Sequence, residues 1–263
     1  MELSLKNNFM DNPKISIIAV NWWAKEFAKL LFRSLYSKSY GCNYEFILVD
    51  NSGEIDNNNL RNEGVLFEAV NTVVLKLNKN LGHGHGMDHG IKNASGEYIL
   101  ILDIDAHILL DEWDKKLISL FEENKDLKLA TASDGGLLKP ARPLAMFFRK
   151  DVFIANNISM AAKDCDGAKF DVGVHAYFKI LSIYGDRSVY RLLGQKTAYN
   201  DVLGNEYALN GERFVYHNWY GTRWYNINGQ CVHDQIDGVR YDDFKVKKDN
   251  LFKQVYAGDQ GTK

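Results

Sequence analysis

Asp103 and Asp105 are the residues whose types and spacing most clearly allow chemistry in this chain. They follow the apolar run Tyr98-Ile-Leu-Ile-Leu102, which has the composition of a buried strand. Side chains two residues apart on an extended chain point to the same side, so both carboxylates are expected to face one way. Carboxylates beside an apolar core are costly unless something compensates them. Because oxygen ligands favour Mg²⁺ or Mn²⁺, we expect a divalent cation that carries a phosphate-bearing substrate.

Alternating strands and helices are expected to position this pair. The strands predicted from apolar runs cover residues 14–20, 45–49, 73–77, 98–102, 127–131, 144–149 and 214–219. The helices predicted from apolar spacing cover residues 24–37, 113–123 and 177–184, with another of about ten residues closed by Gly96 and a docked or partly disordered tail from 240. This alternation predicts an α/β fold with a mainly parallel central sheet flanked by helices. Ligands bind such sheets at the carboxyl ends of strands, where Asp50 also falls.

Composition narrows the class of protein. A net charge of −2 over 263 residues gives no electrostatic case for binding nucleic acid. The three cysteines are far apart and form no CxxC pair, so neither a zinc site nor a disulfide framework is indicated. No apolar run reaches the roughly 18 residues that span a bilayer, and the N-terminus lacks the apolar segment of a signal peptide. We therefore expect one domain over residues 1–263 in the cytoplasm, with peripheral binding to a membrane surface left open.

The stretch Asn80–Ile91 is rich in glycine and histidine. Glycine lets the backbone approach a ligand closely and leaves N–H groups available before a helix. A dinucleotide fingerprint is disfavoured, because Met87 stands where the last glycine is needed. His83, His85 and His89 could suggest a metal cluster, but the glycines between them give little rigidity. A loop whose histidines contact a donor or solvent is the favoured interpretation.

Four motifs then follow one another in a familiar order. They are the strand Ile15–Val20, the turn Val49-Asp-Asn-Ser52, the Asn80–Ile91 stretch, and Ala94-Ser-Gly-Glu-Tyr98 leading into the Asp-x-Asp pair. In this order they resemble a family-two-type glycosyltransferase of the GT-A fold, with Asp88 in place of that family's usual second asparagine. The resemblance covers residues 14–107 and thins beyond 150. It implies a donor half at about 14–110 and an acceptor half with a C-terminal elaboration at about 111–263.

The resemblance implies transfer of a hexosyl or pentosyl group from a nucleotide-sugar donor, UDP-linked in preference to GDP-linked, to an acceptor hydroxyl. It also implies Mn²⁺ or Mg²⁺ as the cofactor, a Lewis acid for the departing diphosphate. The residues it suggests as metal ligands are Asp103, Asp105 and His217, with His233 as a second candidate histidine. The residues it suggests for donor binding are Val20, Trp22, Asp50, Asn80, Gly82, Asp88, Asp103 and Arg223, with Trp23 as an alternative to Trp22. His217 packed among aromatic residues is the structural alternative.

A general base is implied less directly. Phe170-Asp-Val-Gly173 resembles the acceptor-side motif in which a carboxylate accepts the hydroxyl proton of an inverting transfer. Asp171 is the residue chosen, with Asp164 and Asp166 nearby as competitors. An aspartate that caps the following helix is an equally good explanation of Asp171.

Two other functions compete with a transferase. A nucleotidyltransferase or pyrophosphorylase also uses metal-bound carboxylates, but would carry a basic glycine-rich loop where this chain has Asn21-Trp-Trp-Ala24. A non-catalytic carbohydrate-binding module is the rival outside enzymes. The acceptor stays open among a saccharide, a lipid-linked glycan, a protein and a modified nucleic-acid base.

Overall fold

The computed structural model describes residues 14–55, 71–77, 79–133, 141–165, 168–195, 204–218, 224, 230–231, 233–236 and 239–257. Its helices are α1 (Lys25–Ser37), α3 (His83–Asn93), α4 (Trp113–Glu123), α5 (Lys150–Ala155), α6 (Val174–Tyr184) and α7 (Tyr241–Ala257), with a 3₁₀ turn, η1, at Asp186–Ser188. The strands of the main sheet are β1 (Ile15–Asn21), β2 (Tyr44–Asp50), β3 (Asn71–Lys76), β4 (Tyr98–Leu102), β5 (Ala106–Ile108), β6 (Leu129–Ser133), β7 (Arg142–Arg149), β10 (Val189–Gln195), β11 (Gly204–Leu209) and β12 (Glu212–Asn218). Two short hairpins pair β8 (Lys163–Cys165) with β9 (Ala168–Phe170), and β13 (Gln235–Ile236) with β14 (Val239–Arg240).

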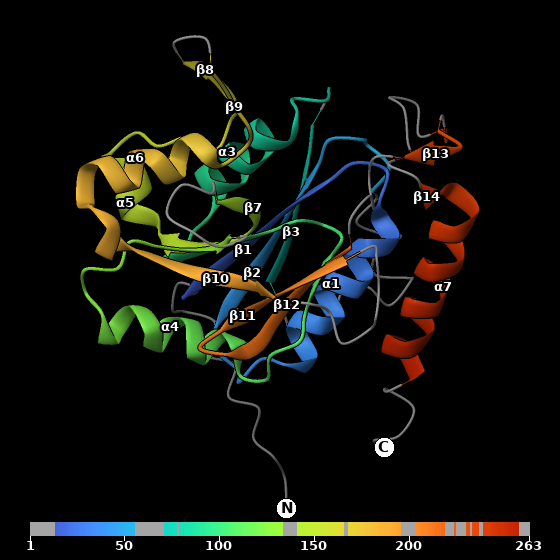
Figure 1. Cartoon of the computed structure of the whole chain (residues 1–263), viewed down its shortest axis with the longest axis horizontal. Coiled ribbons are helices and arrows are strands. Elements are labelled where there is room, and N and C mark those ends of the chain that lie inside the picture. The colour runs from blue at the N-terminus through green and yellow to red at the C-terminus, as the bar shows by residue number, and fades with distance from the viewer. Residues whose placement is uncertain are drawn as a thin grey trace, which may run out of the picture.

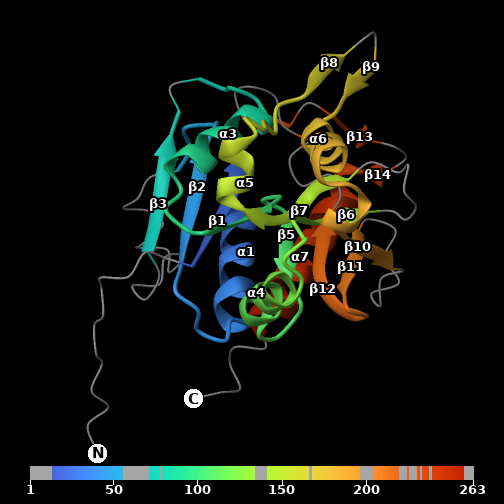
Figure 2. The same ribbon diagram turned by 90° about the vertical axis from the view of Figure 1, so that its left-hand side faces the viewer.

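The main sheet has ten strands in the order β3-β2-β1-β4-β7-β6-β10-β11-β12-β5 (Figures 1 and 2). Strands β3, β2, β1 and β4 are parallel to one another, as predicted. For the ten-stranded sheet as a whole, the prediction of a mainly parallel sheet is wrong, because five of its nine described strand pairings are antiparallel. The sheet is mixed because β7 enters between β4 and β6 in the opposite direction, and β10, β11 and β12 follow one another as a meander.

Helices cover both faces of the sheet, and the alternation of side chains along each strand assigns them to a face. Ile15 and Ile17 of β1 belong to the core beneath α1, α4 and α7. Ile18 and Val20 of the same strand belong to the opposite core, beneath α3, α5 and α6. In Figure 1 the first group of helices lies to the right and below, and the second lies to the upper left. Burial on both faces explains why the strands read as continuous apolar runs.

The predicted elements differ from the observed ones in informative places. The glycine-rich stretch was expected to be a loop leading into a helix, but α3 begins at His83, so His83, His85 and His89 are all helical. The tail from residue 240 forms α7, whose Phe244 packs against Trp224. Strands β5, β10 and β11 were not predicted, because they are short or irregular in composition. Within the described residues, no helix combines the length and apolar character that crossing a membrane requires.

Asp114, in the first turn of α4, ties this helix to the loop after α1. Its Oδ2 accepts hydrogen bonds from the hydroxyl of Ser39 and the backbone N–H groups of Gly41 and Cys42, and its Oδ1 accepts one from Tyr40. Burial acts against the charged form, but these hydrogen bonds outweigh it and lower the pKa of Asp114 below its ordinary value of 3.8. The carboxylate therefore stabilises the folded chain at neutral pH.

We expect Asp114→Asn to lower the free energy of unfolding by about 2–4 kcal/mol, because an amide nitrogen in place of Oδ2 would face three donors. Since the folded pKa is depressed, this stabilisation is present above the ordinary pKa and is lost as the pH falls through the folded pKa. Urea unfolding of both chains at neutral pH and at about pH 3 measures the effect, and the difference between them should shrink in acid. Asp111→Asn is the control, because this exposed carboxylate pairs only with Lys38 in the bonds described. An equal loss in both variants would contradict the prediction.

Candidate active site

A tight turn joins β4 to β5 and carries Asp103 and Asp105. The N–H of Asp103 donates to Leu144 on β7, and the N–H of Ala106 donates back to the carbonyl of Asp103. Ile104 between the two aspartates is buried in the core beneath α1. The two carboxylates therefore share one side as expected, but a turn with a buried middle residue brings this about instead of strand alternation.

His217 reaches this turn because β12 pairs with β5 in an antiparallel register. That register sets His217 opposite Ala106 and Tyr216 opposite His107. Asn218 completes the join, because its backbone N–H and its side-chain Nδ2 both donate to the carbonyl of Asp105, at 3.1 and 2.9 Å. A segment more than a hundred residues away is thereby fixed beside the aspartates.

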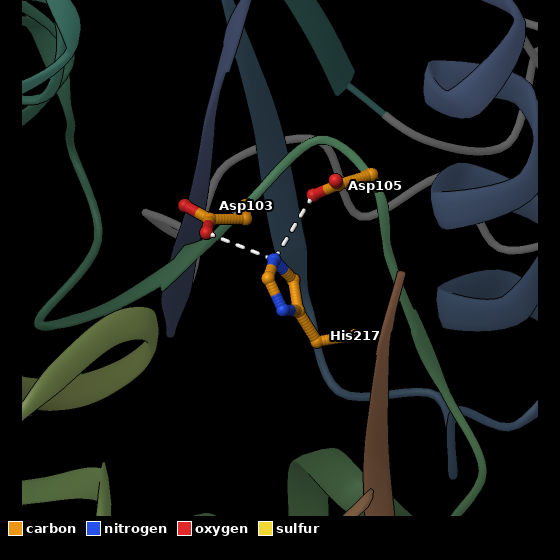
Figure 3. Close-up of side chains that lie close together, drawn as sticks. All are labelled: Asp103, Asp105 and His217. Atoms are coloured by element: carbon orange, nitrogen blue, oxygen red, sulfur yellow. Dashed lines mark ion pairs between the residues drawn. The ribbon is translucent and has the colours of Figure 1, made fainter. Parts of the chain in front are cut away.

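Figure 3 shows the imidazole of His217 directed at both carboxylates. Its Nε2 lies 3.2 Å from Oδ2 of Asp103 and 3.2 Å from Oδ1 of Asp105. Burial acts against a charged imidazole, but the carboxylates of Asp105 and Asp103 outweigh it and raise the pKa of His217 to about 10. At neutral pH the imidazole therefore carries a proton that offsets part of the negative charge of the pair.

These three residues form a donor set that suits a divalent cation. One ligand atom from each lies within 4.8 Å of the others. Two carboxylate oxygens and one imidazole nitrogen match the preferences of Mn²⁺ and also allow Mg²⁺. A cation bound by all three would replace the proton on His217, because a ligating imidazole is neutral. The three residues suggested as metal ligands are thus the ones that the structure brings together.

We expect Asn218→Ala to weaken Mn²⁺ binding about 10- to 100-fold, because it removes an outer contact that orients a ligand. The lost hydrogen bond would let the Asp105 turn move relative to His217. Titration of Mn²⁺ followed by its free-ion EPR signal measures the change. Asn156→Ala is the control, since it loses a similar amide-to-carbonyl bond at the end of α5. Equal affinity in both variants would speak against this role of Asn218.

Asp50 lies at the carboxyl end of β2, beside Asn21 at the end of β1. It is fully buried, and both of its oxygens are engaged in its own loop. Oδ1 accepts from Asn21 and Ser52, and Oδ2 accepts from the N–H of Ile55. Asn21 also binds Ser52 and Glu54, so it organises the loops after both strands. Nothing in the sequence pattern singles out Asn21 for this role, and Asp50 shapes this loop from within.

The residues suggested for a nucleobase pocket at the end of β1 differ in burial. Val20 is buried in the core beneath α3. Trp22 and Trp23 are half-buried, with their rings edge to face and the centroids 6.1 Å apart. Trp23 has a left-handed φ of 51°, an uncommon conformation for a bulky residue. The two indoles thus remain accessible at this end of the sheet, whereas Val20 acts through packing.

The glycines of α3 serve close packing in the structure. A Cβ on Gly84 would lie 2.6 Å from the backbone of Ala161, and one on Gly90 would lie 2.5 Å from Ile18. Asp88 accepts hydrogen bonds from the Ser159 hydroxyl and the N–H of Met160, so it fastens the helix to that segment. Before the helix, Asn80 accepts from the N–H of Gly82, whose φ is 82°.

The remaining suggested residues are exposed or lie outside the described chain. Asp171 is exposed, precedes α6 and accepts a hydrogen bond from the N–H of Val172. His233 is exposed and does not belong to the metal-ligand group found among the described residues. Arg223 and Asp166 lie outside the described residues.

Comparison with known proteins places this geometry in a family. The model of the family described as "Glycosyl transferase family 2" matches residues 16–172. The chain is 25% identical over 182 residues to the uncharacterized glycosyltransferase MJ1057 of Methanocaldococcus jannaschii. That match covers 62% of this chain and 60% of the relative, so the chain spans less than two thirds of the relative's length.

Solved structures share the fold. The mannosyltransferase PcManGT from Pyrobaculum calidifontis, in complex with GDP-Man and Mn²⁺, matches with a TM-score of 0.51 and 14% identity, over 72% of this chain and 59% of that one. Glucosyl-3-phosphoglycerate synthase from Mycobacterium tuberculosis, in complex with Mn²⁺, UDP and glucosyl-3-phosphoglycerate, matches with a TM-score of 0.50 and 12% identity, over 79% of this chain and 87% of that one. The predicted GT-A fold is confirmed. Because the family model spans more than half of the sequence, including the Asp103 and Asp105 turn, the chain belongs to glycosyl transferase family 2.

Proposed function

We propose that this chain transfers a sugar from a nucleoside-diphosphate donor to an acceptor hydroxyl, with Mn²⁺ or Mg²⁺ held by Asp103, Asp105 and His217. The observation that carries the proposal is the convergence of these three side chains at the carboxyl end of the parallel strands. When bound, such a cation offsets the negative charge that develops on the leaving diphosphate. The chain's own residues hold the ligand oxygens in place and anchor the donor beside them.

Donor binding is assigned to the loops that follow β1 and β2 and precede α3. Trp22 would stack on the base, while Asp50 would act through the loop that it organises, and Arg223 would meet a phosphate. Val20, Asn80, Gly82 and Asp88 would shape the same pocket through packing and through the position of α3. A UDP-linked donor is preferred over a GDP-linked one. The Mycobacterium synthase was solved with UDP and the Pyrobaculum enzyme with GDP-Man, both with Mn²⁺.

Asp171 is proposed as the general base of an inverting transfer. The segment that carries Asp171 and the Asp103 turn both lie against the start of β7, which supports this role. Asp103 is bonded through its N–H to Leu144, and a Cβ on Gly173 would lie 3.0 Å from neighbouring Pro143. Asp171 lies two residues before Gly173 and is exposed, so an acceptor hydroxyl could reach it. We further propose that the described sheet belongs to one catalytic domain, with a donor half at about 14–110 and an acceptor half beyond it.

Release of nucleoside diphosphate tests the function. The chain is incubated with UDP-linked and GDP-linked sugars, with Mn²⁺ or with EDTA, and free UDP or GDP is quantified. We expect slow release from at least one donor that depends on Mn²⁺ and stops with EDTA. Absence of release from every donor, together with no metal-dependent binding of UDP or GDP, would overturn the proposal.

A further inference from the structure

The Asp103 carboxylate lies between two imidazoles that come from different parts of the fold. Nε2 of His217, on β12, lies 3.2 Å from its Oδ2. Nε2 of His83, the first residue of α3, lies 3.4 Å from its Oδ1. Each oxygen of this carboxylate therefore faces an imidazole nitrogen, at ion-pair distance in the case of His83. The motif that contains His83 was singled out in the sequence, but the metal-ligand set does not use it.

Several independent contacts set the position of α3 that brings His83 to Asp103. Gly84 allows the helix to approach Ala161 so closely that a Cβ would come within 2.6 Å of its backbone. Asn51, after β2, donates to the carbonyl of Gly82 and accepts from the N–H of Leu81. Since the residues before and after His83 are held by these contacts, the backbone from which its imidazole extends is fixed beside Asp103.

The two imidazoles differ in how far they are exposed to solvent, and this suggests different roles for them. The His217 side chain is 15% exposed, whereas that of His83 is 37% exposed, and Asp103 between them is 19% exposed. His217 is thus enclosed with the two carboxylates, and His83 stands at their open side. From this position His83 can hold Oδ1 of Asp103, while Oδ2 of the same carboxylate faces His217.

We propose that His83 is a positioning residue for Asp103, holding Oδ1 so that Oδ2 faces His217 and a bound cation. This inference rests on the metal site of the proposed function. Ligating carboxylates are usually held by a further contact, and loss of such a contact costs about 10- to 100-fold in metal affinity. His83 supplies that contact from α3, and it thereby links the glycine-rich helix to the site of the leaving diphosphate.

Binding of Mn²⁺ to the full chain, followed by EPR without any donor, tests this role. We expect His83→Ala to weaken binding about 10- to 100-fold, and His83→Gln, which keeps an N–H donor, to recover part of the loss. His85→Ala is the matched control, because His85 is an exposed histidine on the same helix. The thermal unfolding midpoints of the metal-free variants should agree with that of the unchanged chain, so that a general loss of structure is excluded.

Pulsed EPR distinguishes a positioning residue from a ligand. The nitrogen coupling to Mn²⁺ should persist in His83→Ala and disappear in His217→Ala. Disappearance in His83→Ala would overturn the proposal, because His83 would then bind the ion directly. If the unchanged chain and His83→Ala bind Mn²⁺ equally, the role of His83 alone is overturned. If the unchanged chain binds no Mn²⁺, the metal site of the proposed function is overturned as well.

Discussion

Asp105→Asn is expected to abolish metal-dependent release of nucleoside diphosphate and to weaken Mn²⁺ binding by about 10³-fold or more. Asp105 is buried and its Oδ1 lies 3.2 Å from the His217 nitrogen, so it is the most enclosed carboxylate of the group. Removing one of two negative charges from a cation site costs several kcal/mol, and each 1.4 kcal/mol is about tenfold in affinity. An EPR titration with Mn²⁺ and an assay of released UDP or GDP measure the two effects.

Asparagine is the sharper substitution here, because it keeps the volume of a buried side chain and removes its charge. The hydrogen bonds from Asn218 reach the backbone carbonyl of Asp105 and do not involve the Asp105 side chain, so the turn should keep its conformation. Asp126→Asn removes an exposed carboxylate after α4 and serves as the control. Metal-dependent release at the unchanged rate in Asp105→Asn would show that the donor diphosphate is stabilised elsewhere.

The sequence predicted the elements around the acidic turn well because their signals are local. The strand Tyr98–Leu102, the acidic turn after it and the helix Trp113–Glu123 each depend on neighbouring residues. The pairing of β5 with β12 depends instead on a three-residue strand and a partner more than a hundred residues away. His217 was therefore reached through family resemblance, and Asn218 was missed, because nothing near it in the sequence indicates its contact with Asp105.

The helix α3 shows a different limit of local reasoning. Glycine disfavours a helix interior by about 1 kcal/mol relative to alanine, so its sequence favours a loop. Packing against β1 and against the segment at Ala161 compensates for this, because only glycine allows such close approach. The contact of His83 with Asp103 follows from that packing. A site that depends on how tightly two elements pack cannot be derived from the propensity of either one.

Asp171→Asn is expected to lower the rate constant for transfer by about 10²- to 10⁴-fold, because it removes the proposed general base. Binding of the donor and Mn²⁺ should be unchanged, since Asp171 precedes α6 and does not belong to the metal-ligand group found among the described residues. Transfer to an acceptor that supports turnover, with the anomeric configuration of the product read by NMR, measures the effect. Asp164→Asn in β8 is the matched control, because it removes the neighbouring competitor for the same role.

The structural alternative of a capping Asp171 is wrong, because Gly173 occupies the cap of α6 without a side-chain bond, and the choice of asparagine separates catalysis from ordering of the chain. Asp171 Oδ1 accepts a hydrogen bond from the N–H of Val172, and its carbonyl accepts one from Val174, so the residue orders the start of α6. Asparagine keeps a side-chain oxygen that can accept the same hydrogen bond from Val172, but it accepts protons poorly. If Asp171 only orders the chain, Asp171→Asn will keep its activity, whereas Asp171→Ala will lose stability and activity together. A large loss of rate in a stable Asp171→Asn, with inversion in the unchanged chain, is the result that a base requires.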